Sequence, residues 1–323
     1  VVRAVRFARR NDLLTAVRGG GHNVAGNATV ERGFVVDLSP MKGVHVDPGG
    51  RVARVEPGVT LGELDRDLQE FGLAVPTGIN STTGIAGLTL GGGYGWLTRR
   101  YGLTADNLLS ADVVTADGDV LTANEAEHSD LFWAIRGGGG NFGIVTSFEF
   151  RAHRVGPEVT AGLVVFPLDR AAEVLTRYRD VVASAPEDLT VWVVMREAPP
   201  LPFLPSEVHG TPVVVLALCY VGDPARADRA LAPVAAIEGA HAAHVGPMPW
   251  AAWQQAFDPL MTSGVRNYWK THNFAALGDD LIDTLLTRVR RLPGPMCEIF
   301  LGHIAGAPMR RAEDETAFMG RGT

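Results

Sequence analysis

Alternating hydrophobic and polar positions predict that the first part of the chain is built from short strands. Two strand-like runs, 113–115 and 120–122, flank Asp117-Gly118, a dipeptide that favours a hairpin turn. Helical spacing is rarer there and is found at Val2, Val5 and Ala8 and in residues 61–71 and 129–135. The other strand-like runs are residues 34–38, 44–47, 51–56 and 143–150.

The pattern changes near residue 155, where longer apolar strands begin to alternate with amphipathic helices. This arrangement predicts a second α+β domain, in which helices cover one face of a sheet. The fold class is therefore expected to be α+β, with domains at residues 1–152 and 153–323. The predicted strands are 162–166, 190–195 and 213–221, and the predicted helices are 170–184, 225–237 and 279–291.

The bulk composition is that of a globular protein and argues against several functions. The chain is 46% hydrophobic and 20% charged, and its formal net charge is −7. This charge and the absence of a Lys/Arg-rich run argue against nucleic-acid binding, and no segment reaches the ~20 apolar residues of a membrane span. Cys219 and Cys297 lie in apolar runs and are expected in the core. The nine histidines show no metal-ligand spacing, so we expect no metal.

A run of glycines directly after a predicted strand suggests an anion-binding turn. Gly19, Gly20 and Gly21 follow the apolar run 13–17 and precede His22. Consecutive glycines let backbone N–H groups turn toward an anion, and His22 would lie beside whatever they hold. The alternative is a tight turn with an incidental polar residue, since short glycine motifs match by chance.

Glycine is concentrated at two further places, residues 84–95 and 137–143. Three clusters imply repeated close approach of the backbone to something flat or charged. None is followed by Gly-Lys-Ser/Thr, and none has the acidic residue of a dinucleotide fingerprint at the right distance. A nucleotide triphosphatase and a Rossmann dehydrogenase are therefore disfavoured.

Four segments, in order, resemble the FAD-binding segments of vanillyl-alcohol-oxidase-type flavoproteins of the berberine-bridge-enzyme-like branch. The resemblance implies a two-subdomain PCMH-type FAD-binding domain, residues 1–152. It is weaker over residues 153–323, where it implies an α+β substrate domain with an antiparallel sheet covered by helices. The four segments are Arg18–Gly26, Pro76–Gly95, Tyr101–Asn107 and Arg136–Val145.

The resemblance also implies roles for particular residues around one FAD. His22 should carry a covalent bond to the 8-methyl carbon of the flavin, which needs a neutral imidazole nitrogen as nucleophile. Gly19–Gly21 and Ser81–Thr83 would hold the pyrophosphate. Asn107, Ile144 and Val145 would meet the isoalloxazine or adenine portions. The expected cofactor-binding residues are Arg18, Gly19, Gly20, Gly21, His22, Asn23, Gly26, Asn80, Ser81, Thr82, Thr83, Gly87, Asn107, Gly143, Ile144 and Val145.

The chain departs from the family pattern at two positions. Relatives with a second covalent bond have cysteine where this chain has Asn80, so a cysteinyl link is excluded. Some relatives have histidine, thought to stabilise the reduced flavin, where this chain has Leu88. Arg18 would either add positive charge near the pyrophosphate or be a surface residue at a strand end. Both ends are expected to be truncated, because Val1 lies inside a helical pattern and the family's C-terminal flavin-contacting segment is missing.

Substrate chemistry is expected from residues 265–273. If they form a strand, Arg266, Tyr268, Lys270 and His272 share one face. Lys270 and Tyr268 are the candidate catalytic residues, because they could stabilise negative charge or position a hydroxyl or amine for proton removal. A lysine here also resembles that of bacterial amine-oxidising relatives with a single histidyl flavin, and the alternative is a solvated sheet face. Glu298 and His303 are reserve candidates, and Trp250 and Trp253 are expected in the core.

The sequence therefore predicts an FAD-dependent oxidoreductase, and more specifically an oxidase. Hydride would pass from an alcohol, sugar or amine to FAD, and the electrons would then pass to molecular oxygen. The alternatives are a flavin dehydrogenase with another acceptor and a non-catalytic flavin- or drug-binding protein. We expect a small-molecule substrate and no nucleic-acid or membrane partner. A cytoplasmic location is expected, with secretion as the alternative because a targeting signal could lie upstream of Val1.

Overall fold

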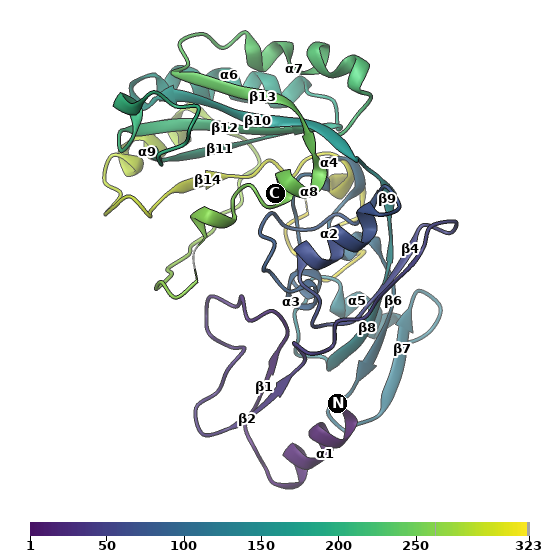
Figure 1. Ribbon diagram of the computed structural model, residues 1–323. Coiled ribbons are helices and arrows are strands. Elements are labelled where there is room, and N and C mark those ends of the chain that lie inside the picture. Colours follow the sequence, from purple (N-terminus) through teal and green to yellow (C-terminus); the bar gives the residue numbers. More distant parts are fainter. Residues whose placement is uncertain (262, 322–323) are drawn as a thin grey trace. The chain divides into compact units, whose positions relative to one another are not determined.

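The computed structural model describes residues 1–261 and 263–321, which divide into two compact units (Figure 1). Unit 1 comprises Val1–Pro157, Trp250–His272 and the described residues from Gly306 onward, and unit 2 comprises Glu158–Pro249 and Asn273–Ala305. The units interleave along the chain, whereas the sequence analysis placed one division between residues 152 and 153. Each unit has its own hydrophobic core. The α+β fold class is confirmed.

Unit 1 is built around a five-stranded antiparallel sheet. Its strands, in spatial order, are β3 (Val44–Asp47), β4 (Val52–Val55), β8 (Ile144–Arg151), β6 (Leu108–Val114) and β7 (Val120–Asn124). β6 and β7 form the hairpin predicted around Asp117-Gly118. Helix α2 (Leu61–Gln69) packs on the sheet through Leu61, Leu64 and Leu68, which are fully buried. Each such leucine contributes roughly 1.5–3 kcal/mol, so this apolar stripe is the main force that holds α2.

The other elements of unit 1 are short. β1 pairs with β2 in parallel, and β5 pairs with β9 antiparallel. These strands are β1 (Thr15–Arg18), β2 (Phe34–Asp37), β5 (Leu73–Ala74) and β9 (His153–Arg154). The helices are α1 (Val2–Arg10), α3 (Ile85–Leu90), α4 (Thr98–Tyr101), η1 (Ala105–Asn107), α5 (Ser129–Ile135), α8 (Trp250–Gln254), η5 (Asp258–Leu260) and η6 (Ala307–Arg310).

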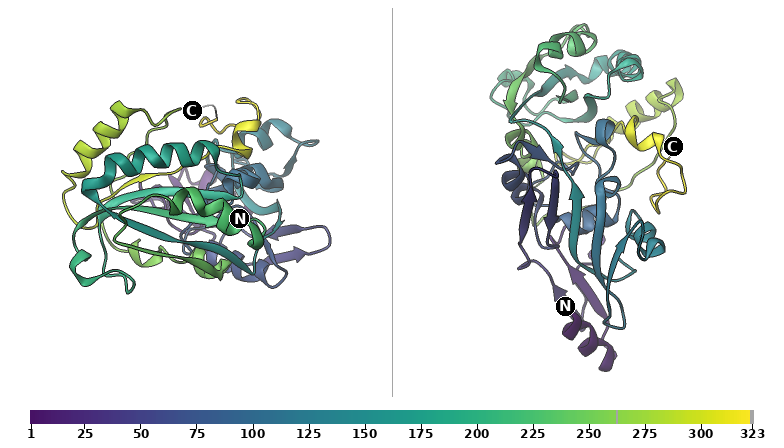
Figure 2. Two further views of the ribbon diagram at one scale, coloured as in Figure 1. Left: turned by 90° about the horizontal axis from the view of Figure 1, so that it is seen from above. Right: turned by 90° about the vertical axis from the view of Figure 1, so that its right-hand side faces the viewer.

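Unit 2 is a second five-stranded antiparallel sheet with helices over one face (Figure 2). Its strands, in spatial order, are β13 (Ala242–Pro249), β10 (Glu158–Pro167), β12 (Pro212–Tyr220), β11 (Leu189–Glu197) and β14 (Ile299–Leu301). The helices are α6 (Ala171–Ser184), α7 (Ala227–Ala235), α9 (Asp279–Val289) and the short η2 (Leu168–Arg170), η3 (Ser206–Val208) and η4 (Pro224–Arg226). Alternate residues of the strands, such as Val164 and Phe166, form one core with α6, α7 and α9. The predicted helix-covered sheet is therefore confirmed, and Cys219 and Cys297 are both free thiols.

Candidate active site

The first two glycine segments cross at Gly20 and Gly84. The glycine turn begins directly after Arg18, the last residue of β1. A side chain on Gly20 would overlap the backbone of Gly84, and one on Gly84 would overlap the backbone of Gly20. Only glycine allows two backbones to approach so closely. The structure thus brings together Gly19–Gly21 and Ser81–Thr83, which the resemblance assigned to one cofactor.

His22 lies exposed beside this crossing. Its Nε2 is 2.8 Å from Thr82 Oγ1, and its Nδ1 is 3.4 Å from Thr83 Oγ1. Partial desolvation lowers the pKa of His22 below its ordinary value of 6.5, and the charge of Asp258 opposes this shift. The imidazole is therefore mainly neutral at pH 7. One ring nitrogen keeps its lone pair, as a nucleophile requires.

Asn80 organises the turn that faces His22. Its side chain is buried, and its Oδ1 accepts hydrogen bonds from the backbone N–H and the hydroxyl of Thr82, at 3.0 Å and 2.6 Å. This is an Asx-turn, in which the oxygen of an asparagine side chain takes the place of a backbone carbonyl as the acceptor. The hydroxyl oxygen of Thr82 therefore contacts both Asn80 and His22.

Ser81 donates hydrogen bonds to the carboxylate of Asp258, a residue that no sequence pattern had indicated. The backbone N–H of Ser81 donates to Asp258 Oδ1 at 2.9 Å, and its hydroxyl donates to Asp258 Oδ2. Asp258 begins η5 in the stretch Trp250–His272, which we call the return segment because it rejoins unit 1. Of the donors that were predicted to hold the pyrophosphate, the two of Ser81 are thus engaged by an anion of the protein itself. No spacing in the sequence pointed to this pairing.

A buried polar cluster attaches the start of the return segment to α2. Asp65 accepts hydrogen bonds from Trp250 Nε1 at 3.3 Å and from Gln254 Nε2 at 3.1 Å, and all three residues are 2% exposed or less. Gln254 Nε2 also lies 3.2 Å from the carbonyl oxygen of Gly78. Burial raises the pKa of Asp65 to about 7, although the hydrogen bonds from Gln254 and Trp250 lower it. The cluster therefore ties the return segment to the backbone just before Asn80.

The second and third glycine clusters both contact Phe318. A side chain on Gly92 would overlap the phenyl ring, and one on Gly137 would overlap the backbone and Cβ of Phe318. Both glycines have positive φ, 105° and 113°, which other residues rarely adopt. The flat group predicted beside these clusters is, at Gly92, the phenyl ring of Phe318, whereas Gly137 faces the backbone and Cβ of the same residue.

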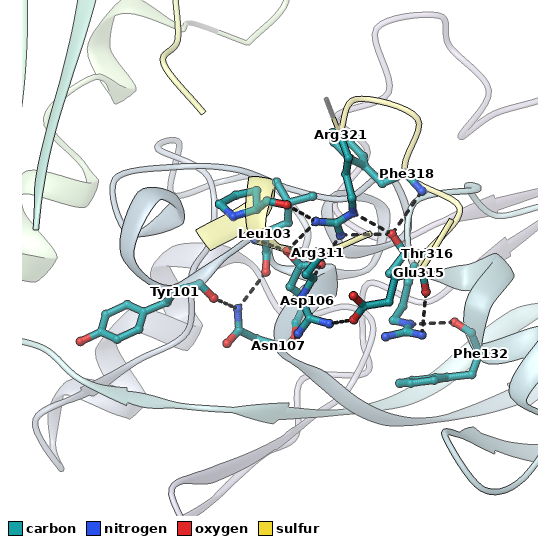
Figure 3. Close-up of polar contacts among 12 residues, drawn as sticks. Tyr101, Leu103, Asp106, Asn107, Phe132, Arg311, Glu315, Thr316, Phe318 and Arg321 are labelled. Atoms are coloured by element: carbon teal, nitrogen blue, oxygen red, sulfur yellow. Dashed lines mark hydrogen bonds and ion pairs between the residues drawn. The ribbon is translucent and has the colours of Figure 1, made fainter. Parts of the chain in front are cut away.

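A buried ion pair holds the segment that carries Phe318 (Figure 3). The guanidinium of Arg321 bonds the carboxylate of Asp106, and each side chain is 1% exposed. Arg321 Nη1 also donates to the carbonyl oxygen of Pro308 at 2.9 Å. Arg311 approaches the same carboxylate, with its Nε 3.6 Å from Asp106 Oδ1. No local pattern in the sequence indicated this cluster, because Asp106 lies about two hundred residues before the two arginines.

Asn107, a predicted cofactor residue, has its side chain engaged within unit 1. Its Nδ2 donates to the carbonyl oxygens of Tyr101 and Leu103, at 3.0 Å and 2.8 Å. Its Oδ1 lies 2.6 Å from His153 Nε2. Burial and then the charge of Arg151 lower the pKa of His153 to about 4, so this imidazole is neutral and donates to Asn107. Asn107 thus supports its own loop, and its contact with FAD stays a prediction.

The remaining predicted cofactor residues have different surroundings. Ile144 and Val145 begin β8 and pair with β6, and a side chain on Gly143 would overlap β6. Gly26 and Gly87, by contrast, have open space where a side chain would be. Such space is available to a ligand. Arg18 and Asn23 are exposed.

The segment predicted to carry the catalytic groups is not a strand. Residues 263–274 are exposed and irregular, and they pair with no strand in the part of the chain that the structure describes. The prediction that Arg266, Tyr268, Lys270 and His272 share a sheet face is therefore wrong. Alternate residues share a face only in a strand, and a strand needs a neighbouring strand to take up its backbone hydrogen bonds. Lys270 Nζ lies 5.6 Å from the ring centre of Tyr268, within the range of a cation–π contact.

The reserve candidates lie in unit 2, on either side of β14. Glu298 forms an ion pair with Arg196, with 2.8 Å between Glu298 Oε2 and Arg196 Nη1. Arg196 lies on β11, so the pair fastens the edge strand β14 to its neighbour, which is a structural role. His303 is half-buried. Trp250 and Trp253 are buried, as expected.

The residues at the crossing fit a flavin dinucleotide. Backbone N–H groups of a glycine turn and the hydroxyl of Thr83 suit a diphosphate, and the neutral His22 suits a covalent bond to the ring. Among residues 1–261 and 263–321, no three or more His, Cys, Asp or Glu residues gather as a metal ion would need. Over the same residues, every helix is too short or too polar to cross a membrane.

The fold and the site define the class of protein, a PCMH-type flavoprotein. A family model described as FAD binding domain matches residues 1–124. An FAD-linked oxidoreductase of Dictyostelium discoideum is 32% identical over 318 residues, which is 98% of this chain and 67% of that protein. The structure of a BBE-like protein of Physcomitrella patens matches with a TM-score of 0.82 and 26% identity, over 99% of this chain and 71% of its own.

The structure of 6-hydroxy-D-nicotine oxidase from Arthrobacter nicotinovorans also matches, with a TM-score of 0.73 and 32% identity. The match covers 82% of this chain and 57% of that enzyme, so this chain spans little more than half of it. The chain belongs to the berberine-bridge-enzyme-like FAD-linked oxidoreductases, as its four segments predicted. It is an FAD-dependent oxidoreductase.

Proposed function

We propose that this protein is an oxidase that transfers hydride from an alcohol, sugar or amine to FAD bonded to His22, and then electrons to oxygen. The observation that carries the proposal is the exposed, neutral imidazole of His22 at the crossing of two glycine segments. Similarity to 6-hydroxy-D-nicotine oxidase supports both the oxidase and the amine class. Asn80, where relatives with two covalent bonds have cysteine, leaves His22 as the single tether.

Different residues around the crossing would bind different parts of the cofactor. The N–H groups of Gly19–Gly21 and the hydroxyl of Thr83 would bind the diphosphate, while the open space at Gly26 and Gly87 would leave room for it. Ser81 would keep Asp258 in place and so hold the return segment beside His22. Bound FAD would supply the hydride acceptor.

Lys270 and Tyr268 would assist removal of the substrate proton. Their segment is anchored near His22, because Asp258, earlier in the same return segment, bonds Ser81. The ammonium group of Lys270 would position a hydroxyl or amine for removal of its proton by a base, or would stabilise negative charge on the reduced flavin. Tyr268 lies within cation–π distance of Lys270 and would limit the positions that the ammonium group takes.

Anaerobic reduction followed by exposure to air tests the function. The wild-type protein is mixed without oxygen with secondary alcohols, oligosaccharides and cyclic amines, and the visible absorption of the flavin is followed. We expect one class to bleach the flavin, and air to restore the colour rapidly with formation of hydrogen peroxide. Slow recolouring would show a dehydrogenase, and no bleaching by any class would show a flavin-binding protein without turnover.

The same assay tests Lys270. In Lys270→Met, bleaching by the active class is expected to slow by about 100-fold or more, the usual contribution of a proton-handling group. Lys42→Met is the matched control, because Lys42 is the other lysine of the chain and forms a surface ion pair with Glu63. An unchanged bleaching rate in Lys270→Met would assign the reaction to other residues.

A further inference from the structure

The hydrogen bonds around Thr82 fix the position of its hydroxyl proton. The backbone N–H of Thr82 can only donate, so the Asn80 atom that faces it at 3.0 Å must be the amide oxygen. That oxygen carries no hydrogen and lies 2.6 Å from Thr82 Oγ1, so it accepts the hydroxyl proton. Thr82 Oγ1 is left to face His22 as an acceptor.

The position of this proton selects one tautomer of His22. Nε2 lies 2.8 Å from Thr82 Oγ1, so Nε2 must carry the hydrogen and donate it. A neutral imidazole has only one N–H, and Nδ1 therefore carries the lone pair. The hydroxyl of Thr83, 3.4 Å from Nδ1, is at the long limit of a hydrogen bond and can rotate away. The structure thus contains a chain of donors and acceptors from Asn80 through Thr82 to His22.

We propose that Asn80 is a positioning residue for covalent attachment of the flavin. Through Thr82 it holds the hydrogen of His22 on Nε2, so that Nδ1 is the atom that bonds the flavin. The inference rests on the covalent link proposed above. It gives Asn80 a function at the position where relatives with two links have a cysteine.

The attachment step balances with oxygen as the oxidant. Nδ1 of His22 forms a bond to the 8-methyl carbon, and one C–H bond of that methyl group breaks. One hydrogen leaves the methyl carbon and one leaves the imidazole. Together with the two electrons released, they reduce one molecule of dioxygen to hydrogen peroxide, the same acceptor as in the proposed turnover.

The test combines the site of attachment with a set of Asn80 variants. Flavin-bearing peptide from digested wild-type protein is examined by NMR, and the flavin is expected on Nδ1. In Asn80→Leu, the Thr82 hydroxyl loses its acceptor and donates to Nε2, which moves the imidazole hydrogen to Nδ1. The covalent share of the bound flavin is then expected to fall roughly fivefold or more, the effect of about one hydrogen bond. Asn80→Asp keeps the acceptor and should retain the wild-type share.

Asn124→Leu is the matched control, because Asn124 Oδ1 also accepts two hydrogen bonds in a turn of unit 1, both of them from backbone N–H groups. It should leave the covalent share unchanged. A flavin on Nε2, or an unchanged share in Asn80→Leu, would overturn the inference while the covalent link stands. Asn80→Ala replaces the leucine variant if that variant binds no flavin. Wild-type protein with only non-covalent FAD would instead overturn the proposed link itself.

Discussion

Asp106→Asn is expected to destabilise unit 1 by about 3–5 kcal/mol, because it leaves the charge of Arg321 buried without its partner. Both side chains of the pair are 1% exposed, and the carboxylate also accepts the backbone N–H of Leu103 at 2.9 Å (Figure 3). The loss should therefore release the segment that carries Phe318 as well as the loop at η1. The measurement is the free energy of unfolding from denaturant titration of both proteins.

The control for this substitution is Glu315→Ala. Glu315 pairs with Arg311 through side chains that are 39% and 33% exposed. A surface ion pair of this kind contributes about 0–1 kcal/mol. A loss in Asp106→Asn no larger than that in Glu315→Ala would show that the buried pair does not hold the segment that carries Phe318.

Asp65→Asn is expected to stabilise the protein at pH 8 by a few kcal/mol and to have little effect near pH 4. Burial raises the pKa of Asp65 to about 7, above its ordinary value of 3.8, so the folded protein binds this proton more tightly than the unfolded chain. The contribution of Asp65 to the free energy of unfolding is therefore fully present below pH 4. It is lost as the pH rises through 7, and the loss is up to about 4 kcal/mol. Asparagine is neutral at every pH and does not show this loss.

Denaturant midpoints at pH 5 and pH 8 check the expectation for Asp65. The difference between variant and wild type should grow with pH. Asp67→Asn is the control, because Asp67 lies on the same helix with its side chain 32% exposed and paired with Arg66. A difference for Asp65→Asn that is the same at both pH values would contradict the buried, protonated carboxyl.

The elements that were predicted correctly are those whose formation depends on residues close together in the sequence. The hairpin at Asp117-Gly118 and the buried stripe of α2 follow from turn chemistry and from the period of apolar residues. The alternation in residues 265–273 is of the same kind, yet those residues form no strand. Alternation describes a strand only when another strand lies next to it, and a single sequence does not show its neighbours.

The parts of the candidate site that were predicted each lie within a motif of consecutive residues. Gly20, His22 and Thr82 were placed from motifs, and the structure brings their segments together. Asp258 and Phe318 could not be predicted, because each reaches its partner from a far part of the chain. Gly92 and Gly137 must be glycine because Phe318 packs against them. The number of glycines alone therefore overstates how much of the backbone faces a ligand.

The central claim is that His22 carries the flavin, and the colour of denatured protein tests it most directly. Wild-type protein is precipitated with acid, washed and measured for visible absorption beside His22→Ala and the control His128→Ala, which replaces an exposed histidine of unit 1. We expect yellow pellets from wild type and His128→Ala, and a colourless pellet from His22→Ala. A colourless wild-type pellet, or a yellow pellet from His22→Ala, would contradict the assignment.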